Sequence, residues 1–339
     1  MDLRQHVLLA VKARNSVNEP IWKLIKEVKR ADEISENERN HFLAILFASL
    51  SDKDIIETLA NDAMAYGAGT SFRSSINNLQ RKKQRLQVLG LDIFPGDNPK
   101  LKDRNFASSL GVPVPRTYFE YVPLDEIKLL PNSILKPVEG VASKGVFFVT
   151  ESGDLRSIKT SQTYSSIADA SEEINRYATS ISTDSWILEE AILNGSNMPA
   201  NDFKVFAFYG VAGMFLEIDR FLESETRYAT YTESGRQIER GPNYKSFVGS
   251  GIPDGIREMS YALSIAAPVP FLRLDFHYGD RGLYLGEITP RPGGTYAGDQ
   301  FEEIDRMLGD HFADAEARLY ADLLNGKEFP AFRAAYGVD

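Results

Sequence analysis

The sequence predicts an α+β protein in which a helical N-terminal part precedes a body rich in β-hairpins. Three observations support this fold class. Residues 1–95 have helical patterns and no convincing strand, two pairs of apolar-rich runs in residues 203–221 and 271–288 have glycine in the link between them, and residues 301–325 are helical again. With 339 residues, of which 43% are hydrophobic, the chain can form two or three domains with substantial cores.

Composition excludes several classes of protein. The formal net charge of -10 argues against a sequence-independent nucleic-acid binder, which needs clustered lysine and arginine. The basic run at residues 81–85 is short and is better explained as a solvated helix face. The absence of cysteine rules out disulfides, thiol nucleophiles and thiolate metal sites. No segment reaches the roughly 18 apolar residues of a membrane helix, and residues 7–11 are too short for a signal core, so we expect a cytoplasmic protein without membrane insertion.

The N-terminal helices are predicted from their caps and apolar runs. Ser35 and Glu38 have the spacing of a capping box, and residues 41–50 form an apolar run long enough for a buried helix. A second pair with the spacing of a cap opens residues 51–65, and two glycines follow that segment. We therefore expect consecutive helices in this part of the chain.

The body of the chain alternates short helices with strands. The hairpin of residues 203–221 is expected to turn over residues 210–213, and the terminal helix of residues 301–325 is expected to be interrupted near Gly309. The other predicted helices are residues 103–110, 171–179 and 256–265, and the other predicted strands or extended segments are residues 112–118, 134–137, 146–150 and 186–192.

The hairpin of residues 271–288 brings two carboxylates together in one of two registers. If its loop has three residues and ends at Gly282 in the left-handed conformation, Asp275 lies directly opposite Glu287. A two-residue loop would instead pair Asp275 with Gly286, and the two acids would point to opposite faces of the sheet. We expect the three-residue loop.

Opposed carboxylates indicate a metal site. Directly opposite residues are about 5 Å apart at Cβ, and like charges there are unfavourable without a positive charge between them. Mg²⁺ is usually held by one or two carboxylates together with nucleotide phosphates. Thr289 and Arg291 follow on the same side if the strand continues, and His277 shares the face of Asp275 but is interpreted as a neighbour, because imidazole is not a preferred Mg²⁺ ligand. An ordinary edge hairpin with solvated acids remains the alternative.

A second candidate feature is the loop that follows Lys136. It contains Ser143, Lys144 and Gly145, and small residues allow backbone N–H groups to approach phosphates while a lysine supplies the positive charge. The Walker pattern G-x-x-x-x-G-K-[ST] does not occur in the chain. Taken alone, the loop is weak evidence, and an ordinary hairpin connection is the favoured explanation.

Three further groups of charged residues have two explanations each. Asp202 and Lys204 alternate on one strand face, and Asp219 with Arg220 closes the partner strand; structural ion pairs account for both groups. Residues 189–192 end an apolar strand and include two adjacent acids, for which a solvated strand end is the alternative. None of these groups indicates a function by itself.

In their order along the chain, these features resemble the ATP-grasp superfamily, and within it the TupA-like branch associated with teichuronopeptide and surface-polymer biosynthesis. Lys100 stands eleven residues before the glycine of Gly-Val-Pro-Val-Pro, where the superfamily has its first phosphate-binding lysine, and Lys102 is the alternative. Ile-Leu-Lys-Pro at Lys136 matches the second lysine. Asp-Phe-Lys-Val-Phe-Ala-Phe-Tyr-Gly, which starts at Asp202, matches the TupA-like segment D-[YF]-K-x-F-x-F-x-G.

The resemblance implies roles for particular residues. The nucleotide would be held by Lys100, Lys136, Ser143, Lys144, Gly145, Glu189, Glu190, Ala191 and Ile192; two Mg²⁺ ions by Asp275, Glu287 and Thr289; and the catalytic residues would be Lys204, Arg220 and Arg291. One departure concerns Thr289, because many superfamily members have asparagine there, and threonine is a weaker ligand.

The resemblance also implies a domain organisation. Helix breakers concentrate in residues 86–99, which predicts a helical domain over residues 1–95 and an ATP-grasp domain over residues 100–326. The latter would comprise a lid subdomain, residues 115–190, and a metal-binding subdomain, residues 191–326. Many superfamily members begin with a Rossmann-like domain instead of helices, so recognition of the acceptor cannot be carried over.

The resemblance implies an ATP- and Mg²⁺-dependent ligase that joins a carboxylate to an amine through an acyl phosphate. The substrates would be small molecules, with a surface-polymer precursor as one candidate. A phosphotransferase on the same fold and a non-catalytic ATP-binding protein remain alternatives. The identity of the substrates and the oligomeric state are open, and a homodimer is one arrangement compatible with the sequence.

Overall fold

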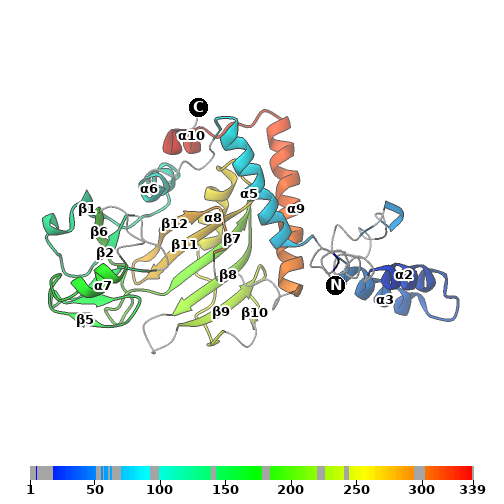
Figure 1. Ribbon diagram of the computed structural model, residues 1–339, viewed down its shortest axis with the longest axis horizontal. Helices are drawn as coiled ribbons and strands as arrows, with labels where there is room; N and C mark the ends of the chain where they lie inside the picture. The colour runs from blue at the N-terminus through cyan, green and yellow to red at the C-terminus, as the bar shows by residue number, and fades with distance from the viewer. Residues whose placement is uncertain are drawn as a thin grey trace. The chain divides into compact units, whose positions relative to one another are not determined.

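The computed structural model describes residues 5, 18–50, 55, 57–59, 62, 70–91, 99–138, 143–177, 184–219, 226–239, 244–293 and 302–337 (Figure 1). The chain divides into two compact units. The first comprises Met1–Leu79 with Glu302–Ala313, and the second comprises Gln80–Phe301 with Asp314–Asp339. In the described residues, no helix is long and apolar enough to cross a membrane.

The first unit is helical in its described part. Helices α2 (Glu19–Arg30) and α3 (Glu36–Ala48) pack around Ile25, Leu43 and Phe47, with a short 3-10 helix η2 (Glu57–Leu59) beside them. The predicted capping box at α3 is present, since the Ser35 hydroxyl accepts from the backbone N–H of Glu38 and the Glu38 carboxylate accepts from that of Ser35. Most of the predicted helix at residues 51–65 lies outside the described residues.

Two helices belong to both units. These are α5 (Phe72–Val88) and α9 (Glu302–Leu324). The predicted interruption of α9 near Gly309 is wrong. Within the first unit, a Cβ on Gly309 would be 1.4 Å from the carbonyl oxygen of Thr70, so the glycine allows a close backbone approach and the helix continues through it.

The second unit contains two six-stranded sheets, joined in the chain by residues 191–201. The first sheet has the order β1-β6-β2-β3-β4-β5 and consists of β1 (Thr117–Val122), β2 (Ser133–Pro137), β3 (Phe147–Val149), β4 (Leu155–Ser157), β5 (Thr163–Tyr164) and β6 (Trp186–Glu190). Its core includes Leu135, Phe147 and Trp186 and is completed by α7 (Ser171–Arg176) and the 3-10 helix η3 (Leu124–Glu126).

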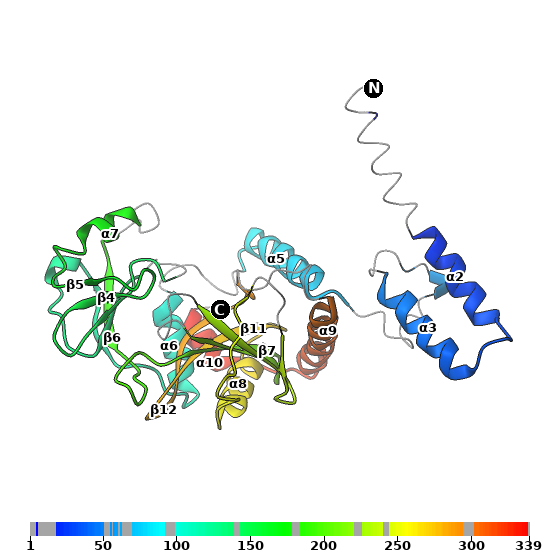
Figure 2. The same ribbon diagram turned by 90° about the horizontal axis from the view of Figure 1, so that it is seen from below.

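The second sheet carries both predicted hairpins. Its order is β10-β9-β8-β7-β11-β12, with β7 (Asp202–Phe208), β8 (Val211–Asp219), β9 (Arg227–Thr232), β10 (Gln237–Ile238), β11 (Leu272–Gly279) and β12 (Gly282–Thr289). All of its ladders are antiparallel. Helix α8 (Ile256–Ile265) packs against β7 and β8 (Figure 2).

The turn between β7 and β8 is shorter than expected. Phe208 pairs with Val211, so only Tyr209 and Gly210 form the turn, and both have positive φ values, 36° and 94°. This is the conformation that tight hairpins with two-residue loops require, and it allows the strand to start at Val211 instead of after Gly213.

Helix α6 (Pro99–Ser109) contacts strands of both sheets and also packs against α10 (Pro330–Tyr336). It begins four residues before the predicted residue 103, because proline is favourable in the first helical turn, where its missing N–H has no partner in any case. The buried carboxylate of Asp103 accepts from the backbone N–H of Ile288 in β12 at 3.0 Å and from the hydroxyl of Tyr336 in α10 at 2.6 Å. Asp103 therefore fixes α6 and α10 to the strand that carries Glu287.

Candidate active site

The β11–β12 hairpin places Asp275 opposite Glu287, but its loop is shorter than expected and a β-bulge compensates for the difference. Gly279 pairs with Gly282, so the loop has two residues and the expected three-residue loop is wrong. The register then shifts by one between Phe276, which pairs with Leu285, and Asp275, which pairs with Glu287. Gly286 is the extra residue of this β-bulge, and the bulge restores the pairing of the two acids.

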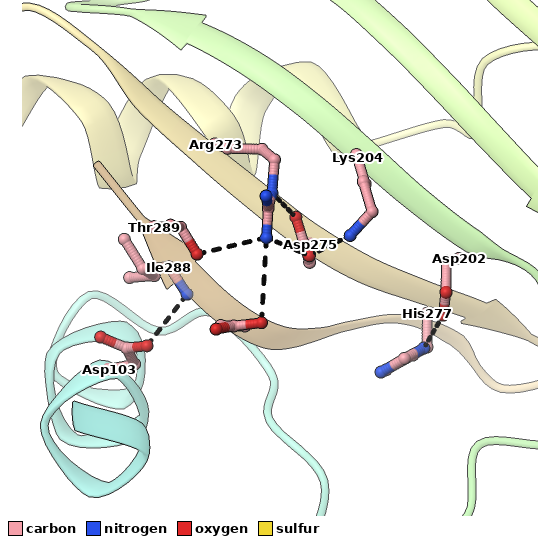
Figure 3. Close-up of polar contacts among 9 residues, drawn as sticks. Asp103, Asp202, Lys204, Arg273, Asp275, His277, Ile288 and Thr289 are labelled. Carbon is pink, nitrogen blue, oxygen red and sulfur yellow. Dashed lines mark hydrogen bonds and ion pairs between the residues drawn. The ribbon is translucent and has the colours of Figure 1, made fainter. Parts of the chain in front are cut away.

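Asp275 lies in a buried cluster of charges (Figure 3). Its Oδ1 accepts from Nε of Arg273 at 2.7 Å and its Oδ2 from Nη2 of Arg273 at 2.9 Å, and the Lys204 ammonium on β7 also bonds to Oδ2. Burial acts to raise the pKa of Asp275, but the positive charges of Lys204 and Arg273 outweigh burial and hold the pKa below its usual value. The carboxylate is therefore ionised.

Arg273 also reaches the other two predicted metal ligands. Its Nη2 donates to Oγ1 of Thr289 at 3.3 Å and lies 3.9 Å from Oε2 of Glu287. Asp275, Glu287 and Thr289 thus converge on one cationic group. Unlike Asp275, Glu287 is about half exposed, with 51% of its side chain accessible, so its oxygens are open to a ligand.

This donor set fits a magnesium ion held together with phosphates. Two carboxylates and a hydroxyl are hard oxygen donors, and a single positive group already lies within reach of all three. Among the described residues, no group of three or more histidine, cysteine, aspartate or glutamate side chains could hold a metal by itself. Mg²⁺ sites that use one or two carboxylates obtain their other ligands from phosphates and water, which agrees with this arrangement.

Two lysines lie near the end of β2, one on that strand and one on α6. Lys136 on β2 forms an ion pair with Glu189 on the neighbouring β6, with 2.5 Å between Nζ and Oε1. The ammonium of Lys100 on α6 donates to the carbonyl oxygen of Pro137 at 2.8 Å. Burial lowers the pKa of Lys100 to about 8, and the charge of Lys136 adds to this effect. Burial and the nearby charge of Lys136 make the charged form of Lys100 unfavourable, so an anionic ligand beside Lys100 would stabilise that charge.

The predicted phosphate loop is described only in its second half, since residues 139–142 lie outside the described residues. Ser143 and Gly145 both have positive φ values, 59° and 69°, and the ammonium of Lys144 lies 5.9 Å from the centre of the Tyr177 ring. The part of the loop that is described thus has a turned backbone, in which successive N–H groups can point to one side.

The segment after β6 contains a buried backbone N–H that has no acceptor among the described residues. The backbone N–H groups of Glu190 and Ala191 donate to the carbonyl oxygens of Arg116 and Asn132, at 2.8 and 3.0 Å. Ile192 is buried, and among the described residues its backbone N–H has no acceptor, although its carbonyl oxygen accepts from Ala200 at 2.8 Å. A buried backbone N–H without a partner is uncommon and indicates a place for an external acceptor.

The segment Ile192–Leu193 lies directly over β11. A Cβ on Gly279 would be 2.3 Å from the carbonyl oxygen of Leu193 and 2.7 Å from Cγ2 of Ile192, so only glycine allows this contact. The same carbonyl oxygen accepts from the backbone N–H of Asp280 at 2.9 Å, and Arg281 forms an ion pair with Glu190. The open N–H of Ile192 and the carboxylates of the second sheet therefore lie on one side of the β11–β12 hairpin.

Of the other two predicted catalytic residues, one is described by the structure and is not part of this arrangement. Arg291 is exposed, and among the described residues it has no ion-pair partner, while Arg220 lies outside the described residues. Asp219, expected beside Arg220, instead forms a buried ion pair with Arg227 on β9, with 2.6 Å between Nη2 and Oδ2. Lys204 is the predicted catalytic residue that the structure places against Asp275.

Comparison with known proteins identifies the family. The family described as TupA-like ATPgrasp matches residues 112–313, which is more than half of the chain. The chain belongs to the TupA-like ATP-grasp family. The predicted α+β fold, in which an ATP-grasp fold follows N-terminal helices, is thereby confirmed. No curated protein matches the chain.

Several solved ATP-grasp ligases are similar to this chain at low identity. The ligase PsnB, complexed with a phosphomimetic variant of its minimal precursor, Mg and ADP, is 16% identical, with a TM-score of 0.34, and the match covers 65% of this chain and 59% of PsnB. D-alanine–D-alanine ligase from Bacillus anthracis, complexed with ATP, is 14% identical, with a TM-score of 0.39 and coverage of 71% and 74%. L-amino acid ligase from Bacillus licheniformis is 14% identical, with a TM-score of 0.36 and coverage of 67% and 52%.

Two residues of this ATP-grasp site were missed by sequence reasoning. Arg273 shares the face of Asp275 because it stands two residues earlier on the same strand, and this alternation was a usable signal. Asp103 had no signal of this kind. Its partners, Ile288 and Tyr336, are distant in sequence and meet it only in the folded chain.

Proposed function

We propose that this chain is an ATP- and Mg²⁺-dependent ligase that joins a carboxylate to an amine through an acyl phosphate. The observation that carries the proposal is the convergence of Asp275, Glu287 and Thr289 on a single cationic group, on the same side of the hairpin as an open backbone N–H at Ile192. Membership of the ATP-grasp family supports ATP as the nucleotide.

The proposed binding mode assigns one part of the nucleotide to each group. The N–H of Ile192 would donate to an adenine nitrogen, and Lys100 and Lys136 would contact the phosphates together with the loop at Ser143–Gly145. Asp275 and Glu287 would hold Mg²⁺, with Thr289 as a weaker third ligand. When bound, Mg²⁺ would neutralise charge on the β- and γ-phosphates.

The proposed reaction has two steps. A carboxylate oxygen of the first substrate attacks the γ-phosphorus, the bond to the β–γ bridging oxygen breaks, and ADP leaves with an acyl phosphate formed. The nitrogen of the amine then attacks the acyl carbon, the carbon–oxygen bond to phosphate breaks, and the nitrogen releases a proton as the amide forms. Arg273 and Lys204, which contact Asp275, would stabilise negative charge on the transferring group, a kind of stabilisation typically worth about 3 kcal/mol or more per group.

The reaction needs no covalent protein nucleophile, which agrees with a chain that has no cysteine. It does need protection of the acyl phosphate from water. The loop of residues 138–145 would provide this as a lid, since closing an active site excludes competing hydrolysis. The proposal extends to small-molecule substrates, and a surface-polymer precursor is one candidate acceptor.

Release of ADP tests the proposal. The full-length protein is incubated with ATP and Mg²⁺ and with pairs drawn from amino acids, sugar acids and amines, and ADP is measured by a coupled assay while products are measured by mass spectrometry. The proposal expects ADP release that requires both a carboxylate and an amine, with a product lighter than the sum of the substrates by one water. A phosphorylated product without any amine requirement would support a phosphotransferase instead, and nucleotide binding without turnover on any pair would contradict catalysis.

A further inference from the structure

The C-terminal ends of α5 and α9 lie side by side in the second unit (Figure 1). Lys82 on α5 forms an ion pair with Glu316 on α9, with 2.7 Å between Nζ and Oε1. The hydrogen bond to Glu316 raises the pKa of Lys82, and the nearby phenol of Tyr320 adds to the increase. Nearer the start of both helices, the backbone N–H of Arg73 donates to Asp305, so the two helices run in the same direction. Residues six to eight positions beyond the ion pair therefore lie at one level, about 10 Å further along.

The side chains at this level are apolar and exposed. Val88 and Leu89 on α5 are 87% and 73% exposed, and Leu324 on α9 is 88% exposed. In the described part of the second unit, all the exposed leucines lie at this end of the two helices, namely Leu89, Leu91, Leu323 and Leu324. Single exposed apolar side chains are ordinary, but several gathered in one place indicate an interaction surface.

The apolar end of α5 is held by a defined helix terminus. The backbone N–H of Leu91 donates to the carbonyl oxygen of Leu86 at 2.9 Å. The N–H of Gly90, whose φ is 78°, donates to the carbonyl oxygen of Gln87 at 3.0 Å. These two bonds form a Schellman motif, which satisfies the last carbonyl groups of the helix. The motif therefore fixes Leu89 and Leu91 at the helix end.

A basic stripe precedes the apolar end of α5. The part of α5 in the second unit, residues 80–88, has four basic residues and no acidic residue, although the whole chain has a net charge of -10. Arg81, Arg85 and Leu89 follow one another at intervals of four residues, so they share one face of the helix. Both arginines are exposed, and neither has an ion-pair partner among the described residues. Their charges are therefore available to an anionic partner.

We propose that this end of the two helices binds the surface of an anionic lipid bilayer. The surface, called here the helix-end surface, consists of Arg81, Arg85, Val88, Leu89, Leu323 and Leu324. Along both helices polar groups come first and apolar side chains follow, which is also the order from headgroups to acyl chains in a leaflet. The arginines can lie at the level of the phosphates while the leucines reach the acyl boundary. Tyr320 lies between these levels, where an aromatic ring with a polar tip is favourable.

A second copy of this chain fits the helix-end surface less well. In a two-fold dimer the same surface faces itself, so Arg81 and Arg85 would meet the same residues of the other copy, and like charges across an interface are unfavourable. The acid at this level of α9, Asp322, is already bonded to Lys327 and Tyr209. An anionic bilayer offers phosphates and hydrocarbon together, which matches both parts of the surface.

Co-sedimentation of the full-length protein with lipid vesicles tests the proposal. Vesicles of phosphatidylcholine are compared with vesicles of equal parts phosphatidylcholine and phosphatidylglycerol. The protein should bind the anionic vesicles more tightly by about tenfold or more, and binding should weaken as the salt concentration rises towards about 1 M, where charges are screened within about 3 Å. Arg81→Gln combined with Arg85→Gln should weaken this binding by about 10- to 30-fold, since each cation at an anionic surface contributes about fivefold. Leu89→Asn combined with Leu324→Asn should weaken it by about tenfold or more, because apolar contact is lost.

Two variants elsewhere in the second unit are matched controls. Arg236→Gln removes an exposed cation and Val248→Asn removes an exposed apolar side chain, and neither should change vesicle binding. Equal binding to both kinds of vesicle, no binding to either, or the same loss in the controls would overturn the proposal. A dimer that sedimentation velocity detects without lipid and that Leu324→Asn dissociates would assign the surface to a second copy and overturn it too. The proposed reaction uses none of these residues, so the outcome leaves the proposed function unaffected.

Discussion

Replacing Asp275 by asparagine should destabilise the second unit strongly. Arg273, Lys204 and Asp275 each have only 11% of their side chains accessible, and Asp275 is the buried carboxylate that contacts both cations, while the half-exposed Glu287 lies 3.9 Å from Arg273. The change to asparagine leaves two buried positive charges together and places an amide NH₂ against one of them. Removing one partner of a buried charge cluster typically costs about 3–5 kcal/mol.

The expected effect on thermal unfolding follows from the size of the unit. A domain of 150–250 residues shifts its Tm by about 2–4 °C for each kcal/mol, so Asp275→Asn should lower the Tm by about 10 °C. The assay is thermal unfolding of the nucleotide-free protein followed by circular dichroism. Asp280→Asn is the matched control, since Asp280 is exposed in the turn of the same hairpin and its change should have an effect within about 0.5 kcal/mol.

A second variant identifies the cause. Combining Asp275→Asn with Lys204→Met removes one of the stranded cations, and buried ion pairs can often be replaced by apolar side chains without loss of stability. The double variant should therefore recover part of the lost Tm. A Tm shift below about 2 °C for Asp275→Asn, or no recovery in the double variant, would refute the argument that Asp275 neutralises a buried cluster.

Two further predictions concern pH. Because the pKa of Lys100 is about 8, its ammonium loses its proton as the pH rises through that value, so ADP affinity measured by calorimetry should fall between pH 7 and pH 9. Lys100→Arg stays charged and should flatten this pH dependence. An identical fall in affinity in both proteins would contradict the role given to Lys100. Burial raises the pKa of Asp103 from 3.8 to about 7, although its bonds to Tyr336 and Ile288 act against this increase. The folded protein therefore holds this proton more tightly than the unfolded chain does. The resulting contribution to the free energy of unfolding is fully present below pH 4 and is lost as the pH rises through 7. Urea unfolding at pH 5 and pH 8 should show this loss, and Asp103→Asn should remove it; an unchanged difference would count against the assignment.

The site shows what the sequence could and could not predict. Alternation along β11 and β12 predicted that Asp275 faces Glu287, but only with a three-residue loop that the structure does not have. The bulge at Gly286 was not visible in the sequence, because the need for glycine there comes from the imidazole of His277, which in the folded chain occupies the space of a Cβ. Glycine in a strand signals either a turn or a close approach, and only the folded chain shows which one applies.

The helices illustrate the same limit. Gly309 was interpreted as a helix breaker, whereas in the first unit it permits contact with the backbone of Thr70. Capping boxes are local, and the one at Ser35 was predicted correctly for that reason. The short strands β4, β5 and β10 were missed because they contain two or three residues each, too few for a hydrophobic period to be read.

The most direct test of the account is a calorimetric titration of the full-length protein and of Glu287→Gln with ADP, each with Mg²⁺ and with EDTA. Glu287 is exposed, so the change should leave the fold intact. The account predicts that Mg²⁺ tightens ADP binding by the unmodified protein, and that Glu287→Gln loses that gain by about tenfold or more while its binding in EDTA is unchanged. Equal enhancement by Mg²⁺ in both proteins would contradict the assignment of Glu287, and with it the metal–nucleotide site on which the proposed function depends.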